Sequence, residues 1–359
     1  MNNKNNYAVI MAGGIGSRFW PMSTSEHPKQ FLDVLGIGKS LIKLTYERMC
    51  LVVPPENIFV VTNEQYVDLV KTHLEEINGN QILTEPVRKN TAPCITYAAA
   101  KIYSLNENAN LIIAPSDHLI LKEDRFKRIL NIALNESEKG EQLITLGIKP
   151  NRPDTGYGYI QFHQDGDIIG GQIKKVKQFT EKPNKELAEL FLKSGDYYWN
   201  SGIFIWKAKT LLKAIQKFKP ELYGQFCSDY HVYNTPAEYN FIHKAFFDCE
   251  DISIDFAIME NAKNIYVVLA DFDWSDLGTW SSLYDHLEKD FKGNATSNST
   301  TWMVDSTECL VKLPNDKEAI IQGLNNYIIA ESENRLLIIN KSDEQNMKKY
   351  LAALKKKIY

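Results

Sequence analysis

The sequence predicts an α/β protein built on a mostly parallel sheet, followed by a smaller β-rich segment. Two observations support this prediction. Short apolar runs alternate with amphipathic stretches of helical length over residues 7–148, which is typical of parallel strands joined by helices on both faces of a sheet. A glycine-rich loop directly follows the first apolar run, and in such sheets ligands bind beyond the carboxyl ends of the strands.

The apolar runs of this first part predict strands, and the stretches with helical apolar spacing between them predict helices. The run from Asn110 to Ala114 is apolar throughout its interior, as expected of a strand that is buried on both faces. The expected strands are 7–11, 57–62, 81–84, 110–114 and 142–148, and the expected helices are 40–52, 64–77, 91–103 and 123–139.

The pattern changes after Lys149. Residues 157–162 and 173–179 are predicted to form paired strands, with either Asp165-Gly166 or Gly170-Gly171 as the turn. The other expected elements are helices at 184–192 and 207–218, strands at 201–206 and 265–270, and an amphipathic stretch at 252–262.

The polar stretch 292–301 is predicted to be a linker, because it consists of small residues and has no periodicity. Short β segments over 302–340 and a helix over 345–356 are expected to follow it. We therefore expect a large domain over 1–291 and a small C-terminal β domain over 292–359 that ends in a helix. The short segments hint at one or two coils of a β-solenoid, that is, a partial β-helix.

The composition excludes several classes of protein. The 359 residues are 44% hydrophobic and 24% charged, as in ordinary globular proteins. No run is long enough to span a membrane and the N-terminus is polar, so we expect a cytoplasmic protein without a membrane partner. Five scattered cysteines without Cys-x-x-Cys spacing indicate reduced thiols. The net charge of −4 argues against nucleic acid as a partner.

The loop over residues 12–31 has the residues needed to bind a polyphosphate. Gly13, Gly14 and Gly16 let the backbone approach a ligand closely, and successive N–H groups in such a turn form an anion-binding nest. Arg18 adds a planar guanidinium fork and Lys29 a point charge. A glycine-rich surface loop with two solvated charges is the alternative interpretation.

This loop matches neither of the common nucleotide-binding motifs. A Walker loop ends in Gly-Lys-Ser/Thr, and that sequence is missing here. A dinucleotide-binding fingerprint continues directly into a helix, whereas Pro21 and Pro28 keep this loop irregular beyond its glycines.

Two aspartates follow expected strands and are candidate metal ligands. Asp117 comes after 110–114 and Asp276 after 265–270. Brought together beside a triphosphate they would hold Mg²⁺, which needs few protein ligands because it keeps several waters. Alternatively, each aspartate caps a helix. Asp273 is a weaker third candidate.

Three further segments have polar groups suited to a sugar phosphate. Lys182 suits a phosphate monoester, and the Glu181 carboxylate can accept two vicinal hydroxyls. Asn200 offers an amide to a hydroxyl, and Gly158 lies in a Gly-Tyr-Gly-Tyr stretch whose N–H groups can face a sugar. Each segment also has a simpler interpretation. Glu181 and Lys182 could lie in a solvated turn, Asn200 could lie in another turn, and Gly158 could mark the start of a strand.

The segment from Glu85 to Pro93 allows two interpretations as well. Glu85 and Asn90 could bind the N–H and carbonyl groups of guanine. Alternatively the segment is a loop that starts a helix, with Thr91 as N-cap and Pro93 near the first turn. His27 and His118 are interpreted as structural, because isolated histidines usually are.

The run Gly-x-Gly-x-Arg-x-x-Pro-Met-x5-Pro-Lys over residues 14–29 resembles the signature of sugar-1-phosphate nucleotidyltransferases. Segment 85–93 is similar to the mannose-1-phosphate guanylyltransferase branch of that family. The other matching segments, in the order of the family, are Pro-Ser-Asp-His at 115–118, Phe-Thr-Glu-Lys-Pro at 179–183, Trp-Asn-Ser-Gly at 199–202 and Trp-Ser-Asp-Leu-Gly-Thr-Trp at 274–280.

The resemblance implies a Rossmann-like nucleotide-diphospho-sugar transferase fold over 1–291. It implies direct attack of mannose 1-phosphate on the α-phosphorus of GTP with Mg²⁺, giving GDP-mannose and pyrophosphate. The chain is too short to include the isomerase half of bifunctional relatives, so no isomerase activity is expected; a homodimer is expected. The implied roles are phosphate binding by Arg18 and Lys29, metal binding by Asp117 and Asp276, sugar-phosphate binding by Lys182, sugar binding by Gly158, Glu181 and Asn200, and nucleotide contacts by Ala12, Gly13, Gly14, Gly16, Glu85, Asn90 and Thr91.

Two alternatives to this function stay open. One is another nucleotidyltransferase of the same class that uses a different base or sugar, which segment 85–93 disfavours. The other is a non-catalytic nucleotide-sugar-binding regulator. Loss of the loop arginine or of a metal aspartate would favour the regulator, but Arg18, Asp117 and Asp276 are all present.

Overall fold

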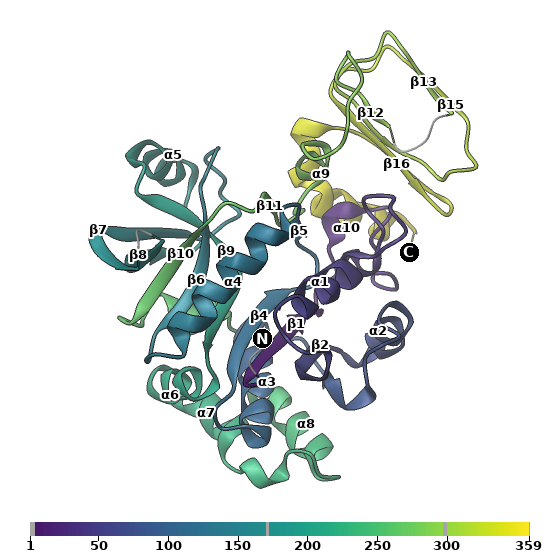
Figure 1. The fold of residues 1–359 in the computed structure, drawn as a ribbon. Helices are drawn as coiled ribbons and strands as arrows, with labels where there is room; N and C mark the ends of the chain where they lie inside the picture. Colours follow the sequence, from purple (N-terminus) through teal and green to yellow (C-terminus); the bar gives the residue numbers. More distant parts are fainter. Residues whose placement is uncertain (1–3, 170–171, 297–299, 359) are drawn as a thin grey trace. The chain divides into compact units, whose positions relative to one another are not determined.

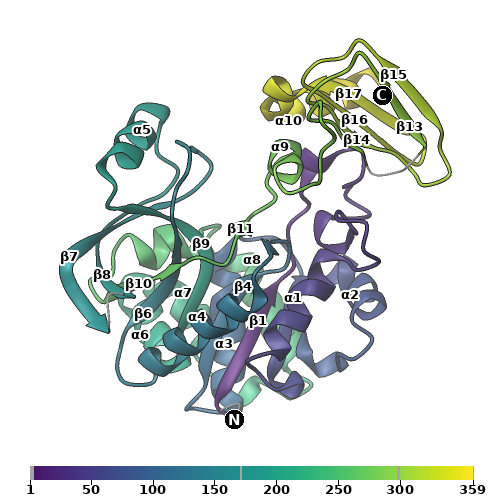
Figure 2. The same ribbon diagram turned by 45° about the horizontal axis from the view of Figure 1, so that its top comes forward.

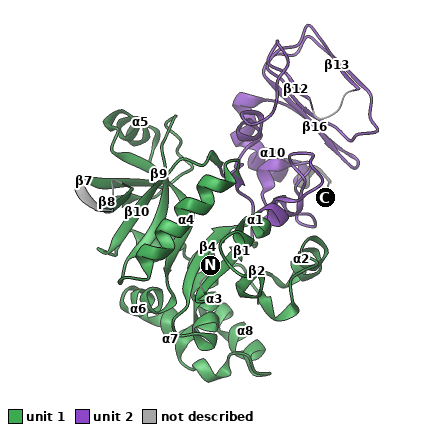
Figure 3. Cartoon of the chain, viewed as in Figure 1, with its two compact units in different colours: residues 1–13, 45–116, 120–274 green, residues 14–44, 117–119, 275–359 purple. Residues whose placement is uncertain are grey.

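The computed structural model describes residues 4–169, 172–296 and 300–358. The chain forms two compact units, each made of segments that are distant in the sequence (Figure 3). Unit 1 comprises residues 1–13, 45–116 and 120–274, and unit 2 comprises residues 14–44, 117–119 and 275–359.

Unit 1 is built on a nine-stranded sheet in the order β3-β2-β1-β4-β9-β6-β10-β8-β7 (Figure 1). β1 pairs in parallel with β2 and β4, β2 with β3, and β6 with β10, whereas β9 lies antiparallel between β4 and β6. The expected α/β fold is confirmed, and β1 to β4 are parallel to one another as predicted. β8 is antiparallel to β10 and to β7, so the sheet as a whole is mixed. The strands are β1 (Asn6–Met11), β2 (Ile58–Asn63), β3 (Ile82–Glu85), β4 (Asn110–Pro115), β6 (Leu143–Ile148), β7 (Tyr159–Ile169), β8 (Ile173–Thr180), β9 (Tyr197–Lys207) and β10 (Ile265–Ala270).

Helices cover both faces of this sheet (Figures 1 and 2). Tyr7 and Val9 of β1 belong to a core that includes residues of α3, α6, α7 and α8. Ala8 and Ile10, which alternate with them, are fully buried as well. Helix α4 contacts β4, β6, β9 and β10. The helices are α1 (Leu41–Cys50, which crosses the unit boundary), α2 (Val67–His73), α3 (Thr91–Leu105), α4 (Glu123–Ser137), α5 (Lys185–Ser194), α6 (Ala208–Phe218), α7 (Pro220–Cys227) and α8 (Glu238–Asp248).

Several expectations from the sequence need correction. Asp165-Gly166 lies inside β7 and is not its turn, and Gly170-Gly171 lies outside the described residues. β9 begins at Tyr197, earlier than predicted, because the aromatic run pairs with β7. The stretch 252–262 contains a π-helical turn over Asp255–Met259, and α7 and α8 were not predicted at all.

Unit 2 has its own core, which joins the glycine-rich loop to the C-terminal segment. The core contains Phe19 of the loop together with Trp280, Ile328 and Met347. β12, β14 and β16 pair in parallel, β17 is antiparallel to β16, and β13 pairs in parallel with β15. These elements are β12 (Ala295–Thr296), β13 (Thr301–Val304), β14 (Leu310–Lys312), β15 (Ala319–Gln322), β16 (Tyr327–Ser332), β17 (Arg335–Asn340), α9 (Trp280–Tyr284) and α10 (Met347–Ile358).

The predicted linker 292–301 therefore contains β12 and the first residue of β13, while residues 297–299 lie outside the described residues. Two more short strands, β5 (Leu119–Ile120) and β11 (Trp274–Ser275), lie where the chain passes from one unit to the other. Among the described residues, no helix has both the length and the apolar character that a membrane span requires.

Helix α3 is fixed by a buried ion pair. The Lys101 ammonium lies 2.6 Å from the carboxylate of Glu238, the first residue of α8. The Tyr97 hydroxyl and the Asn234 N–H also donate to this carboxylate, at 3.1 and 2.7 Å. Helix α3 begins in the segment that is expected to bind the base, so this ion pair helps to fix the position of that segment.

We expect Lys101→Met to lower the free energy of unfolding by about 3 kcal/mol, because the Glu238 charge stays partly buried without its counter-ion. Urea denaturation measures this change. The control is Lys71→Met, whose exposed ammonium lies 4.0 Å from Asp68 and should change stability by less than about 1 kcal/mol. Equal losses in the two variants would contradict the argument.

Candidate active site

The glycine-rich loop presents a row of backbone N–H groups. Gly16 has a left-handed φ of 67°, and within the described part of the chain no N–H group of residues 14–18 donates a hydrogen bond. Such a row forms an anion-binding nest. The N–H group of Ala12, in contrast, donates to the carbonyl oxygen of Val61 at 2.7 Å and so continues the strand structure. Ala12 therefore does not belong to the nest.

The Lys29 ammonium is buried and donates to three oxygens of the protein. It lies 2.7 Å from Oδ2 of Asp117, 2.8 Å from the carbonyl oxygen of Asp276 and 3.0 Å from that of Leu277. All four residues belong to unit 2. Lys29 thus holds together the loop and the two segments that carry the predicted metal ligands, a role that the sequence did not indicate.

These residues line a pocket of about 290 Å³ within unit 2. Arg18 is exposed there and makes no hydrogen bond or ion pair with the described residues. The pocket gathers five predicted residues, and it also includes Lys348 of α10; the five are Gly16, Arg18, Lys29, Asp117 and Asp276. The lining residues are Gly16, Ser17, Arg18, Phe19, Lys29, Asp117, His118, Asp276, Leu277, Gly278 and Lys348.

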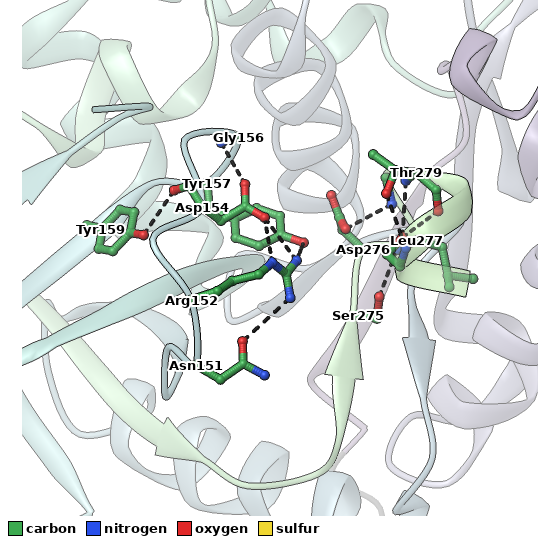
Figure 4. A network of polar contacts seen from close by, with 12 residues as sticks. Asn151, Arg152, Asp154, Gly156, Tyr157, Tyr159, Ser275, Asp276, Leu277 and Thr279 are labelled. Atoms are coloured by element: carbon green, nitrogen blue, oxygen red, sulfur yellow. Dashed lines mark hydrogen bonds and ion pairs between the residues drawn. The ribbon is translucent and has the colours of Figure 1, made fainter. Parts of the chain in front are cut away.

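The electrostatics of the pocket keep Asp117 ionised. Burial alone would raise its pKa, but the Lys29 ammonium, helped by His118 and hydrogen bonds, more than offsets burial and lowers the pKa below its usual value. Asp276 is held by its own turn, where Oδ1 accepts from the Gly278 N–H at 2.9 Å (Figure 4). A Cβ on Gly278 would lie only 2.6 Å from the Asp276 carboxylate, so any larger residue there would displace this carboxylate.

The alternative in which Asp276 caps a helix is not realised. The N-cap of α9 is Thr279, whose side chain accepts from the Ser282 N–H. Among the described residues there is no cluster of three or more histidine, cysteine or acidic side chains suited to a metal. A pair of carboxylates on a phosphate pocket nevertheless fits Mg²⁺, whose remaining positions are taken by water and phosphate oxygens.

The remaining candidates near these segments lie elsewhere. Asp273 forms an ion pair with Lys122 at 2.7 Å in unit 1 and does not line the pocket. His118 lines the pocket, whereas His27 does not. Gly14 is not among the lining residues either.

Glu85 ends β3 in unit 1 and is buried, with 5% of its surface exposed. Its Oε1 has no hydrogen-bond partner among the described residues. A Cβ on Gly13 would lie 3.3 Å from its Oε2, which places the carboxylate beside the first glycine of the loop. Burial raises the pKa of Glu85 to about 7 and outweighs the opposing effects of Cys94 and Arg88. Because buried polar atoms rarely lack partners, Oε1 is a candidate ligand acceptor.

The rest of this segment shapes the start of α3. Asn90, with a positive φ of 66°, is the N-cap, since its Oδ1 accepts from the Thr91 N–H at 3.0 Å. The alternative in which Thr91 is the N-cap is therefore wrong; its hydroxyl accepts from the Ile254 N–H. Arg88, not predicted, donates to the Gly13 carbonyl oxygen at 3.1 Å and to the Tyr66 hydroxyl at 2.8 Å.

The predicted sugar-binding residues cluster in unit 1. The Asn200 N–H donates to the Gly158 carbonyl oxygen at 2.8 Å, and a Cβ on Gly158 would lie 2.5 Å from Oε2 of Glu181. The Asn200 amide is itself engaged: Nδ2 donates to Asp255 at 2.9 Å, and Oδ1 accepts from the Thr145 hydroxyl at 2.9 Å. Asn200 thus lies within β9, not in a turn, and orients Asp255.

Asp255 was missed by the sequence interpretation. Burial, followed by the nearby negative charge of Glu181, raises the pKa of Asp255 to about 7. The Lys182 ammonium lies 2.5 Å from Oε1 of Glu181 and is largely exposed. The sequence did contain a signal for Asp255, because this acid lies inside an otherwise mostly apolar run, Ile-Ser-Ile-Asp-Phe-Ala-Ile-Met over 252–259. Two adjacent carboxyl groups of this kind suit vicinal hydroxyls.

Another unpredicted residue, Arg152, fixes the loop before Gly158 (Figure 4). Arg152 Nε donates to Asp154 at 3.0 Å, and its guanidinium lies over the Trp199 ring at 5.2 Å. Asp154 accepts from the Gly156 N–H at 2.8 Å and, through its carbonyl oxygen, from the Tyr159 hydroxyl at 2.9 Å. These contacts stabilise the loop between β6 and β7 beside Gly158.

A family model described as nucleotidyl transferase matches residues 7–293 of the chain. The chain belongs to this family. It is 36% identical over 350 residues to "Mannose-1-phosphate guanylyltransferase" of Klebsiella pneumoniae and to the protein of the same name in Escherichia coli, covering 97% of this chain and 73% of each relative. A solved structure named "mannose-1-phosphate geranyltransferase" from Thermus thermophilus covers 98% of this nucleotidyl transferase and 99% of its own chain, at 26% identity and a TM-score of 0.84.

We expect Gly16→Ala to destabilise this nucleotidyl transferase by about 2 kcal/mol, because a left-handed φ is unfavourable for alanine and the new Cβ would overlap Cβ of Lys29. Gly14→Ala is the matched control: a Cβ there meets nothing within 4 Å, and its φ is not left-handed. Urea denaturation compares the two. A Gly16→Ala variant as stable as Gly14→Ala would refute the assigned geometry.

Proposed function

We propose that this protein transfers GMP from GTP to mannose 1-phosphate and releases pyrophosphate. The pocket of unit 2 is the observation that carries the proposal, because it combines free N–H groups, an open guanidinium and two carboxylates. The curated relatives named mannose-1-phosphate guanylyltransferase support the choice of substrates, since they align along 97% of the chain.

The phosphate groups of GTP bind the N–H groups of residues 14–18 and the guanidinium of Arg18. Asp117 and Asp276 are the residues that would hold Mg²⁺, which supplies neutralisation of the phosphate charge when bound. Lys29 keeps Asp117 ionised and fixes the turn of Asp276. Its contribution to catalysis is therefore to position the ligands as well as to add positive charge.

The reaction needs no general base from the protein. The attacking phosphate oxygen of mannose 1-phosphate is already an anion. It forms a bond to the α-phosphorus of GTP while the bond from that phosphorus to the bridging oxygen breaks, so that pyrophosphate leaves on the opposite side. The residues of the site accelerate this step by holding the two substrates in line and by stabilising negative charge.

Glu85 selects the base in this proposal. An ionised carboxylate accepts both from N1–H and from the 2-amino group of guanine, and Oε1 of Glu85 has no other partner among the described residues. Adenine has an acceptor at the position of N1–H and would leave the buried carboxylate unsatisfied. Such mismatches give strong discrimination.

Glu181 and Asp255 bind hydroxyl groups of mannose, with Asn200 orienting Asp255 and Gly158 leaving room beside Glu181. Lys182 binds the sugar phosphate, because its exposed ammonium is tethered at Glu181 and can reach an anion nearby. Asn90 and Thr91 shape the base pocket through the start of α3.

We also propose that residues 1–291 act as the catalytic domain and residues 292–359 as a C-terminal domain. The parallel ladders β12-β14-β16 and β13-β15 support its description as coils of a partial β-helix. Trp302 and Ile320 are paired and exposed on β13 and β15, which supports a homodimer formed through this domain.

The proposal is tested by pyrophosphate release with Mg²⁺ and mannose 1-phosphate, offering GTP, ATP, UTP and dTTP in parallel. Release with GTP should far exceed the others, and Asp276→Asn should lower kcat/KM about a hundredfold or more. The control Asp273→Asn alters only an exposed ion pair and should keep activity. Preference for UTP or dTTP would refute the guanine assignment, and no release with any nucleotide would favour a non-catalytic binder.

Guanine recognition should depend on the ionisation of Glu85. Since burial raises the pKa of Glu85 to about 7, the neutral acid predominates below this pH and loses one acceptor. We expect the ratio of kcat/KM for GTP to that for ITP, which lacks the 2-amino group, to fall as the pH drops through about 7. The shared phosphates cancel in this ratio. Glu85→Gln should give a low ratio without pH dependence; a ratio that stays constant in the wild type would count against Glu85.

A further inference from the structure

The pocket of unit 2 is lined by one positively charged side chain that belongs to none of the sequence motifs. Lys348, the second residue of α10, lines this pocket together with Arg18 and Lys29. Lysine-rich stretches of a terminal helix, such as the one around Lys348, usually form a solvated face. The structure instead brings α10 into contact with the short 3₁₀ turn Ser17–Phe19 of the glycine-rich loop.

The backbone of Lys348 is held firmly in this position. The preceding residue, Met347, is 1% exposed and lies in the same core as Phe19 and Trp280. Just before the helix, the buried Glu344 accepts from the Ser281 N–H at 2.9 Å. The side chain of Lys348 is exposed, and it makes no hydrogen bond or ion pair with the described residues.

The charges of the pocket call for a further open cation. The Lys29 ammonium already donates to Asp117 and to two carbonyl oxygens. Of the lining residues this leaves the guanidinium of Arg18 and the ammonium of Lys348 to face a ligand. A triphosphate has several negative charges, more than one guanidinium offsets, and a flexible ammonium adapts well to phosphate oxygens.

We propose that Lys348 binds the phosphate chain of the nucleotide, so that the C-terminal helix completes the phosphate-binding pocket. This inference rests on the proposed function for the identity of the nucleotide, whereas the binding of a polyphosphate rests on the pocket alone. Lys348 and Arg18 together face the anion, and Lys29 fixes the carboxylates beside them.

The direct test is calorimetric titration of inorganic tripolyphosphate, which has neither base nor sugar, into the full-length protein. Lys348→Ala should weaken binding about tenfold, the loss of one charge-assisted hydrogen bond, and Lys348→Arg should restore most of it. The matched control is Lys349→Ala, which removes the same charge from the neighbouring residue, one that does not line the pocket. It should bind as the wild type does.

Kinetics give a second readout. Lys348→Ala should raise KM for GTP and weaken inhibition by pyrophosphate by similar factors, while KM for mannose 1-phosphate stays unchanged. A wild type that releases no pyrophosphate refutes the proposed function, yet the titration still decides the role of Lys348. Equal tripolyphosphate binding by wild type and Lys348→Ala, an equal loss in Lys349→Ala, or no binding by the wild type would each overturn the inference.

Discussion

The buried ammonium of Lys29 is the interaction on which the phosphate pocket depends. It joins the glycine-rich loop to Asp117 and to the turn at Asp276 and Leu277 through three short bonds. Without the ammonium, burial would raise the pKa of Asp117 and so favour the neutral acid, which is a poor ligand for a cation. One side chain thus sets both the shape of the pocket and the charge of its carboxylates, and a substitution at Lys29 would disturb several groups at once.

The parts of this arrangement that arise locally could be predicted from the sequence. The alternation of apolar runs and helical patterns predicted most strands of the sheet, and the glycine-rich run predicted the nest that contains Gly16. The partners of Lys29 could not be predicted, because one of them lies 247 positions away and hydrogen bonds of this kind leave no periodic signal. Helix α7 was missed because Gly224 weakens its helical pattern, and α8 because aromatic residues occur on its exposed side as well.

Burial of the Glu85 carboxyl group lowers the stability of the folded state at neutral pH, and the packing of unit 1 offsets this loss. Its folded pKa of about 7 exceeds the ordinary value of 4.5, so folding opposes ionisation. Stability contributed by this group is fully present below the unfolded pKa and declines as the pH rises toward 7, by about 3 kcal/mol in all. A residue that lowers stability at neutral pH and has an oxygen without a partner among the described residues is better explained by a ligand than by packing.

The composition of unit 2 explains why a pocket formed by an N-terminal loop depends on the C-terminal segment. Phe19 follows the nest and cannot be exposed without losing its contacts with Trp280, and both belong to a core that extends to Ile328 and Met347. The C-terminal β segments therefore have a structural role in the pocket, because they supply the apolar surface against which the glycine-rich loop packs. The same core anchors α10, so it determines both the stability of the glycine-rich loop and the position of Lys348.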